Sequence, residues 1–565
     1  MEHKMILSAS GWRKVFAQSG REDDTTAKIG IDNKALSFLA AESFLEWLNK
    51  KKPKIVVAAD TRPTGKEVAE YVLRALALGK AKAVWLGVAA APEIMAYARG
   101  FDGFVYISAS HNPVGHNGIK FGLDDGGVLN AAQNLEVRKI FERKLQKADA
   151  AAIIARAKTA DIKGVLAQKA ANKKAALAAY QKFSRRVISG LECGRAQNDF
   201  FAGLKAALKK NKITVCADFN GSARALCIDK KFFAECGASF KSINARPGQI
   251  VHEIIPEPEN LVHVARFAES VAAETASKPQ TIIGYMPDCD GDRGNIVYYS
   301  RKSGKAKILK AQEVFALSVL AELSCAAERK KSRLAVAVNC PTSMRIEEIA
   351  KKFGAKVFRA EVGEANVVNL AREKRAAGYK VPILGEGSNG GTITYPAAVR
   401  DPLNTVFALI KLLTMSAGLS LDDILDSLPK YTTTGVSESR AILKIKTSDH
   451  AVLKKNFQKV FESSYKSDSE GLVKKYGITS WKCSLTNGTK EKLGATDFSK
   501  SGKGGLKILF YENNSKTPAS FIWMRGSGTE PVFRIMCDVK GADAKKEREL
   551  LAWETKMLAQ ADKMQ

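Results

Sequence analysis

Short apolar runs alternate with amphipathic stretches along the first three quarters of the chain. Lys54–Ala59, Ile213–Ala217 and Leu334–Val338 have the composition of buried β-strands, and helical patterns follow two of them at Glu67–Ala77 and Ile346–Phe353. Apolar strands that alternate with amphipathic helices are typical of α/β layers. Because this unit recurs about three times, the pattern predicts three similar α/β domains in series.

The remaining segments have a different character. Phe141–Lys210 is rich in Ala and Lys, which predicts helices and a domain junction. From about Tyr431, strand-like runs at Arg440–Ile445 and Leu506–Phe510 precede a terminal helical stretch, as in a smaller α+β domain. The predicted fold class is α/β with a C-terminal α+β domain, and the predicted domains are residues 1–180, 181–301, 302–430 and 431–565.

The charge balance indicates an anionic partner. The chain has 565 residues, enough for several domains, and its 89 Lys and Arg exceed its 59 Asp and Glu to give a net charge of +30. Such a field attracts anions. Because the basic residues are spread from Arg13 to Lys563 without an aromatic-interleaved patch, we expect a phosphorylated small molecule rather than nucleic acid.

Cysteine spacing and hydropathy narrow the class of protein further. The nine cysteines, from Cys193 to Cys537, are odd in number and contain no CxxC pair, which argues against a disulfide framework or a structural zinc site. No apolar run approaches about 18 residues, and the N-terminus has no signal-peptide pattern. The sequence therefore predicts a cytoplasmic enzyme with no membrane partner.

The first chemical motif is the loop around Ser110, which follows the apolar run Phe104–Ile107. Asn-Pro and Asn-Gly pairs force tight turns there. A hydroxyl on such a loop can serve as a nucleophile or phosphoryl carrier where a base and a cation are near, and His111 and Lys120 are candidates for these tasks. The alternative is a serine turn beside a structural histidine. Against it, two of the six histidines, His111 and His116, lie in this loop.

The second motif places carboxylates at alternate positions, namely Asp288, Asp290 and Asp292. Carboxylates this close repel unless a hard cation neutralises them, and Mg²⁺ prefers a few such oxygens together with a phosphate. A calcium-binding EF-hand would need Gly at its sixth and Glu at its twelfth position, where this chain has Arg293 and Tyr299. A purely structural acidic turn is the remaining alternative.

The third motif is the glycine-rich loop Gly385–Gly391, which follows another apolar run. Glu386 and Ser388 could hydrogen-bond adjacent sugar hydroxyls, while the glycines allow a ligand to approach the backbone. Taken alone, a glycine-rich turn is a common feature of loops.

The fourth motif, Arg525–Pro531, lies between two strand-like runs. Its small residues can form an anion-binding nest, hydroxyls add donors, and arginine offers a bidentate fork for phosphate. The alternative is a hairpin loop with an exposed arginine. The candidate phosphate-binding residues are Arg525, Ser527, Gly528, Thr529 and Arg534.

These motifs, in this order, resemble the α-D-phosphohexomutase superfamily along nearly the whole chain. The residues that carry the resemblance are Ser10–Arg13, Asp60–Gly65, Ser110–Pro113 and Asp288–Arg293. The resemblance implies a heart-shaped molecule of four domains, with one loop from each domain at a central cleft. It also implies a hexose 1-phosphate/6-phosphate mutase that acts on glucose or mannose through a hexose 1,6-bisphosphate, as a monomer or dimer.

Roles for individual residues follow from the resemblance alone. Ser110 corresponds to the phosphoserine, which would bind Mg²⁺ together with the three aspartates. Lys120, His111 and Arg13 would handle proton transfer and charge at the reacting oxygen, with Arg293 beside them. The phosphate that is not reacting would rest on Arg525–Thr529.

The sequence departs from the family pattern at two places, of which the first leaves the sugar preference open and the second concerns the hinge. Many bacterial members have Gly-Glu-x-Ser-Gly-His in the sugar loop, but here Asn389 and Gly390 occupy the last two positions. Arg400–Asn404 stands where the family usually has an Asp-Gly pair, so hinge behaviour is expected to differ. A phosphoglucosamine mutase is the main alternative, favoured by Ser108 and Gly291, and a non-catalytic phosphosugar-binding paralogue or a phosphatase are further ones.

Overall fold

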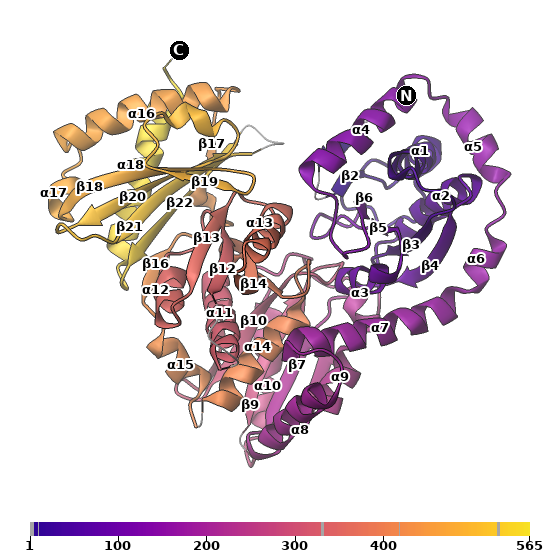
Figure 1. Cartoon of the computed structure of the whole chain (residues 1–565), viewed down its shortest axis with the longest axis horizontal. Coiled ribbons are helices and arrows are strands. Elements are labelled where there is room, and N and C mark those ends of the chain that lie inside the picture. Colours follow the sequence, from indigo (N-terminus) through magenta and orange to yellow (C-terminus); the bar gives the residue numbers. More distant parts are fainter. Residues whose placement is uncertain are drawn as a thin grey trace. The chain divides into compact units, whose positions relative to one another are not determined.

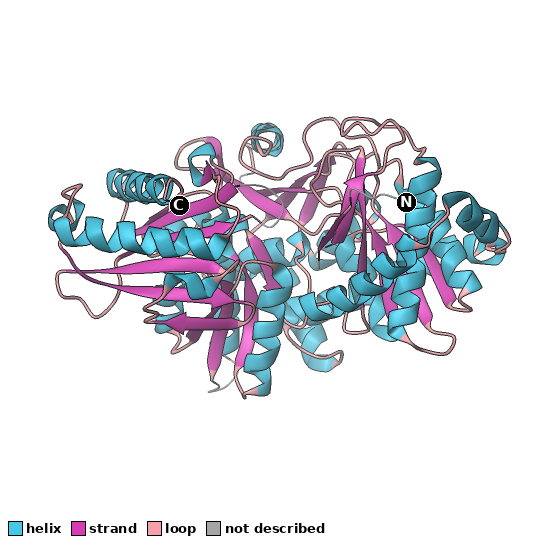
Figure 2. Ribbon diagram, turned by 90° about the horizontal axis from the view of Figure 1, so that it is seen from above, coloured by secondary structure: helices cyan, strands magenta, loops and turns pink. Residues whose placement is uncertain are grey.

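Buried apolar runs form the central strands of four β-sheets, and helices pack against each sheet (Figure 2). The computed structural model describes residues 5–8, 11–278, 280–328, 333–416, 418–527 and 532–564. The chain divides into two compact units, one formed by the chain through Leu309 with Ile393–Asp422, the other by Lys310–Thr392 with the chain from Asp423.

The first sheet carries the Ser110 loop. Its strands, in spatial order, are β1 (Ile6–Ser8), β2 (Gly11–Val15), β6 (His116–Gly122), β5 (Gly103–Ile107), β3 (Lys54–Ala59) and β4 (Lys82–Val88). Strand β3 runs parallel to β4 and β5, and β5 is antiparallel to β6. Both faces are covered, one by α1 (Gly30–Leu48) and α2 (Gly65–Leu78), the other by α3 (Ala91–Tyr97), which explains the unbroken apolar run in β3 (Figure 1).

The second sheet carries the aspartate loop. Its order is β11 (Lys305–Ile308), β10 (Gly294–Ser300), β9 (Thr281–Pro287), β7 (Ile213–Asp218) and β8 (Ser239–Ile243). Helix α10 (Val262–Glu274) packs on β9 and β10, and α9 (Asp229–Cys236) packs beside β8. Helix α14 (Pro402–Met415), which is far away in sequence, also contacts β9 and β10.

The third sheet carries the glycine-rich loop. Its order is β13 (Lys356–Ala360), β12 (Leu334–Asn339), β14 (Lys380–Glu386) and β15 (Gly391–Thr394). The helices around it are α11 (Ala311–Ala327), α12 (Arg345–Lys352) and α13 (Glu364–Ala376).

The three sheets share one topology. In each, the first strand of the shared unit (β3, β7 or β12) lies between its second and third strands, and runs parallel to both. A fourth strand follows beside the third. The prediction of three similar α/β domains is confirmed. Moreover, all three predicted loops occupy the same connection, between the third and fourth strands, which the sequence patterns did not reveal.

The C-terminal sheet is built differently. Its order is β16 (Tyr431–Thr433), β22 (Val532–Lys540), β21 (Ser520–Gly526), β20 (Gly505–Glu512), β18 (Ile478–Asn487) and β19 (Lys490–Leu493), with β17 (Ile442–Lys444) also paired to β22. Neighbouring strands are antiparallel. Helices α16 (His450–Ser467) and α18 (Ala544–Ala561) contribute to the apolar core on one face (Figure 1), so the α+β prediction is confirmed.

One predicted strand in this domain is shorter than expected. The expected run Arg440–Ile445 begins with the 3₁₀ turn Ser439–Ala441, and only β17 is extended. The Arg440 guanidinium forms ion pairs with Glu438 and Glu547, which hold the backbone in that turn.

The Ala/Lys-rich segment is helical, as predicted. It comprises α4 (Ala131–Gln146), α5 (Ala150–Lys158), α6 (Lys163–Ala167), α7 (Lys169–Ser189) and α8 (Arg195–Lys210). Helix α7 continues without a break across the predicted boundary at residue 180. The bounds of the four predicted domains remain predictions. Two buried contacts fix α7: Lys173 pairs with Glu93 at 2.6 Å, and the Tyr180 hydroxyl donates to Asp401 at 2.6 Å.

Among the residues that the structure describes, no helix is both long enough and apolar enough to cross a bilayer.

Candidate active site

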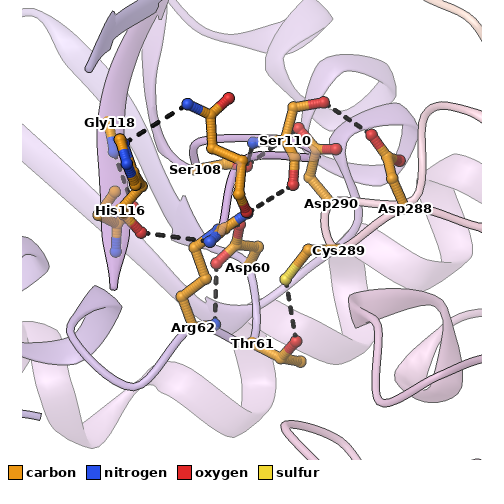
Figure 3. A network of polar contacts seen from close by, with 12 residues as sticks. Asp60, Thr61, Arg62, Ser108, Ser110, His116, Gly118, Asp288, Cys289 and Asp290 are labelled. Carbon is orange, nitrogen blue, oxygen red and sulfur yellow. Dashed lines mark hydrogen bonds and ion pairs between the residues drawn. The ribbon is translucent and has the colours of Figure 1, made fainter. Parts of the chain in front are cut away.

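Ser110 lies on a strained, buried turn that an arginine holds in place. It has a φ of 55°, in the left-handed region that non-glycine residues rarely adopt, and is 2% exposed. The Arg62 guanidinium donates to the carbonyls of Ser110, Asn112 and Pro113, and Asp60 accepts from its Nε at 3.2 Å (Figure 3). The backbone of the serine loop is therefore fixed from the neighbouring strand end.

The Ser110 hydroxyl points to the aspartate loop. It donates to Asp288 at 2.6 Å (Figure 3). The Ser108 hydroxyl accepts from the Ser110 amide at 2.9 Å and donates to Asp290 at 3.0 Å. The Lys120 ammonium reaches the same Asp290 oxygen at 2.6 Å. The structure thus brings the predicted nucleophile Ser110 and the cation Lys120 to the aspartate loop, which lies about 170 to 180 residues further along the sequence.

The three aspartates form a candidate metal site. Asp288, Asp290 and Asp292 are buried, and one carboxylate oxygen from each lies within 4.8 Å of the others. Burial, together with the charges of Asp290 and Asp292, raises the pKa of Asp288 well above its usual value. The Oδ1 atom of Asp290 is buried without a hydrogen-bond partner among the described residues. This charge and this orphaned oxygen fit a hard cation such as Mg²⁺.

Basic side chains surround the same site. Arg400 donates to both carboxylate oxygens of Asp292 at 3.1 Å. The positive charge of Arg293, burial and the charge of Arg13 lower the pKa of His111 to about 2, so its imidazole is neutral near pH 7. Burial lowers the pKa of Lys120, but the nearby charge of Asp290 more than offsets this and leaves the pKa raised. The site therefore combines a charged lysine with a neutral imidazole.

The glycine-rich loop is rigidly braced. The Asn339 amide donates to Glu386 at 3.2 Å and to Ser388 at 2.9 Å, and both acceptors are buried. Asn389 donates to Glu386 at 3.3 Å and accepts from the Gly391 amide at 3.0 Å. The residue that departs from the family pattern thus closes the loop on itself.

The predicted phosphate loop begins with two arginines that face each other. Arg525 on β21 pairs in register with Arg534 on β22. Arg525 forms an ion pair with Glu361 at 3.0 Å without hydrogen-bond alignment, while Arg534 is exposed and donates to the Val436 carbonyl. The Ser527 amide donates to the Val532 carbonyl at 2.8 Å. Gly528 and Thr529, and Ser10 of the N-terminal motif, lie outside the described residues.

Several residues that shape the site carry no sequence signal of their own. Arg400 was noted only as a departure, yet it neutralises Asp292. Arg224 supports the aspartate loop from below: it donates to the Gly291 carbonyl at 3.3 Å and to Asp401 at 3.1 Å. A Cβ atom at Gly291 would lie 2.4 Å from the Arg224 side chain, so glycine is required there.

The chain is similar to known proteins along most of its length. The chain matches the family described as "Phosphoglucomutase/phosphomannomutase, alpha/beta/alpha domain I" over residues 15–148, and domain III of the same family over residues 314–431. A phosphoglucomutase/phosphomannomutase of Thermococcus kodakarensis is 26% identical over 93% of both chains. A probable phosphoglucosamine mutase of Methanocella arvoryzae is 26% identical over 75% of this chain and 79% of its own length.

Solved structures share the fold. A phosphoglucomutase/phosphomannomutase family protein from Burkholderia thailandensis superposes with a TM-score of 0.64 at 17% identity, covering 99% of this chain and 98% of its own. A phosphoglucomutase from Paramecium, parafusin, gives a TM-score of 0.64 at 15% identity, with 98% and 95% covered. The matches to domains I and III of the phosphoglucomutase/phosphomannomutase family, together with the relative aligned over 93% of this chain, place the chain in the α-D-phosphohexomutase superfamily of enzymes.

Proposed function

We propose that this protein interconverts hexose 1-phosphate and hexose 6-phosphate through a phosphorylated Ser110. The observation that carries the proposal is the buried cluster in which the Ser110 hydroxyl contacts Asp288 while Lys120 and Ser108 contact Asp290. A hydroxyl beside a cation site and a lysine is the arrangement that phosphoryl transfer requires.

Magnesium fits the three aspartates, which would hold it with the phosphate of Ser110. When bound, it supplies positive charge to the transferring phosphoryl group. An all-oxygen donor set favours hard cations, and Mg²⁺ is proposed among them because it is usually held by one or two carboxylates together with a phosphate.

Side chains of the serine loop and its neighbours are proposed to carry out the phosphoryl and proton transfers. In the first transfer, the bond between phosphorus and the Ser110 oxygen breaks and a bond to the free sugar hydroxyl forms. Lys120 and Arg13 would neutralise the charge that develops, and His111, next to Ser110 in the sequence, is proposed to handle the sugar proton. The product is a hexose 1,6-bisphosphate, which turns over and returns its other phosphate to Ser110 in the reverse chemistry.

The other predicted loops are proposed to bind the rest of the substrate. Glu386 and Ser388, fixed by Asn339, are proposed to bind sugar hydroxyls, and Arg293 is proposed to contact the reacting phosphate. Arg525, Ser527, Gly528, Thr529 and Arg534 are proposed to hold the phosphate that is not reacting. The pairing of Arg525 and Arg534 in register supports this role, because it places two guanidinium groups on neighbouring strands where the loop begins, although Arg525 is also paired with Glu361.

Glucose and mannose phosphates are the proposed substrates, and glucosamine phosphate is the second candidate. The relative with 93% coverage is named for the first pair, whereas relatives from Methanocella, Methanococcus and Clostridium are named phosphoglucosamine mutases. We propose a cytoplasmic location and a monomer or dimer.

A panel of 1-phosphates of glucose, mannose and glucosamine, assayed for the corresponding 6-phosphates with Mg²⁺ present, tests the function. We expect isomerisation of at least one sugar without net release of inorganic phosphate. Net phosphate release would instead identify a phosphatase, and absence of any product would favour a binding paralogue.

A further inference from the structure

A cavity far from the serine loop in sequence lies inside the second compact unit. Its volume is about 480 Å³, which is sufficient for a small organic molecule. One side is formed by α12 and β13, and the other by strands of the C-terminal sheet. The apolar part of its wall comprises Met344, Val357, Tyr431, Leu493, Leu509 and Pro518.

A buried lysine without a partner lines this cavity. Lys507, on β20, is 1% exposed, yet among the described residues its ammonium makes no ion pair or hydrogen bond. Its recorded contact is with the face of the Phe521 ring, at 4.5 Å from the centroid. An isolated buried ammonium costs free energy, and burial accordingly lowers its pKa.

The other charges of the wall are paired or exposed. Arg359 pairs with Glu347 at 2.6 Å, and Lys540 pairs with Glu348 at 2.7 Å. Lys351 and Glu491 are exposed to solvent, and the charge of Glu491 acts on Lys507 without an ion pair between the two. Lys507 is therefore the buried charge of the wall that a ligand could neutralise.

We propose that this cavity binds a small organic monocarboxylate, with its carboxylate on Lys507 and its apolar body against Met344 and Leu509. A single negative charge is favoured because the unmatched buried charge is one ammonium. A doubly charged phosphate would bring a second negative charge for which the wall has no further unpaired buried cation. The lining residues come from α12 and β13 on one side and from the C-terminal sheet on the other. A bound ligand would therefore contact both sides and link them.

A matched pair of ligands tests the charge requirement on the full chain. Saturation-transfer NMR would measure the affinity of 3-phenylpropionate and of its uncharged analogue 3-phenylpropanamide. We expect saturable binding of the acid and at least tenfold weaker binding of the amide. Equal affinities, or no saturable binding of the acid, would overturn the proposal.

Matched variants test the residue. Lys507→Met keeps the length of the side chain and should weaken binding of the acid at least tenfold while leaving Tm unchanged or higher. Lys482→Met is the control, since Lys482 lies on the adjacent strand opposite Leu509 and outside the lining. A lower Tm with unchanged binding would make Lys507 a structural residue and refute the site.

A second route avoids dependence on that one variant. Val357→Phe introduces a larger side chain into the cavity without altering a charge, and it too should reduce binding at least tenfold. Retained binding in this variant contradicts the proposed location. The same titration in Ser110→Ala should match the wild type, so failure of the proposed mutase activity and failure of this site are distinguishable.

Discussion

The hydroxyl of Ser110 donates a 2.6 Å hydrogen bond to Asp288. The first prediction follows: wild-type protein should carry a fraction with one phosphate on Ser110, and Ser110→Ala should lose it. Activity should fall roughly a thousandfold or more, since the nucleophile forms the covalent intermediate. Intact-mass analysis and a 6-phosphate assay measure both. Ser108→Ala is the matched control and should keep the phosphate. Full activity of Ser110→Ala would refute the phosphoserine mechanism.

The second prediction concerns the aspartate loop. Burial and its neighbours raise the pKa of Asp288, so Asp288→Asn should relieve repulsion in metal-free protein. We expect Tm in chelator to stay equal or rise, while the increase in Tm that Mg²⁺ causes in the wild type disappears. Differential scanning calorimetry with and without Mg²⁺ measures both, and the exposed Asp124→Asn serves as control. An unchanged response to Mg²⁺ would place the metal elsewhere.

The third prediction concerns the brace under the serine loop. Arg62→Met leaves Asp60 buried without its partner and frees four carbonyls, which should lower the free energy of unfolding by about 3–5 kcal/mol. Urea unfolding measures the change. Arg138→Met, which breaks an exposed pair with Glu142, should cost less than about 1 kcal/mol. Equal losses in the two variants would contradict the structural role of Arg62.

The fourth prediction concerns a stacked histidine pair beside the second sheet, with His252 in a loop and His263 on α10. Burial lowers the pKa of His252, but its hydrogen bond with Asp218 more than offsets this, so the pKa is raised. The resulting stabilisation is fully present below the ordinary histidine pKa of about 6.5 and is lost as pH rises through the folded-state value. Its stacking partner His263 has a pKa lowered by burial and by His252, and so opposes this trend as pH falls.

His263→Gln therefore isolates the effect. In that variant, Tm should fall between pH 6 and 8, and the further change His252→Gln should flatten this slope. A slope that is unaffected by the second substitution would show that the Asp218–His252 contact does not determine it.

The fifth prediction concerns the two facing arginines. Removing a charge-assisted arginine–phosphate contact costs about 2 kcal/mol or more, so Arg525→Ala should raise KM at least about tenfold. The bisphosphate should escape more often, and added hexose 1,6-bisphosphate should partly restore the rate. Steady-state kinetics compare this variant with the exposed Arg548→Ala. An unchanged KM without extra bisphosphate release would show that the loop is a hairpin turn that does not bind phosphate.

Local patterns predicted the strands and loops well because burial and turn chemistry act over a few residues. The strand Lys54–Ala59 has the predicted bounds, and Ser110 lies on the predicted turn. What the patterns did not reveal depends on contacts between distant segments. Arg400 meets Asp292 across 108 residues, and Asn339 meets Glu386 across 47, and neither pair has a spacing that a motif could encode. The sequence does not distinguish Lys507 from an exposed lysine on a strand, because its burial depends on the packing of distant segments.

The shared connection between third and fourth strands has a consequence for how such an enzyme can diversify. Each chemical task is assigned to one short connection on its own copy of the same sheet topology. If the glycine-rich loop binds the sugar as proposed, substitutions at residues 387–390 would change the sugar preference while the strands that position Ser110 and the aspartates stay the same. Asn389 and Gly390 are the residues at which this separation of substrate preference from phosphoryl chemistry would be seen.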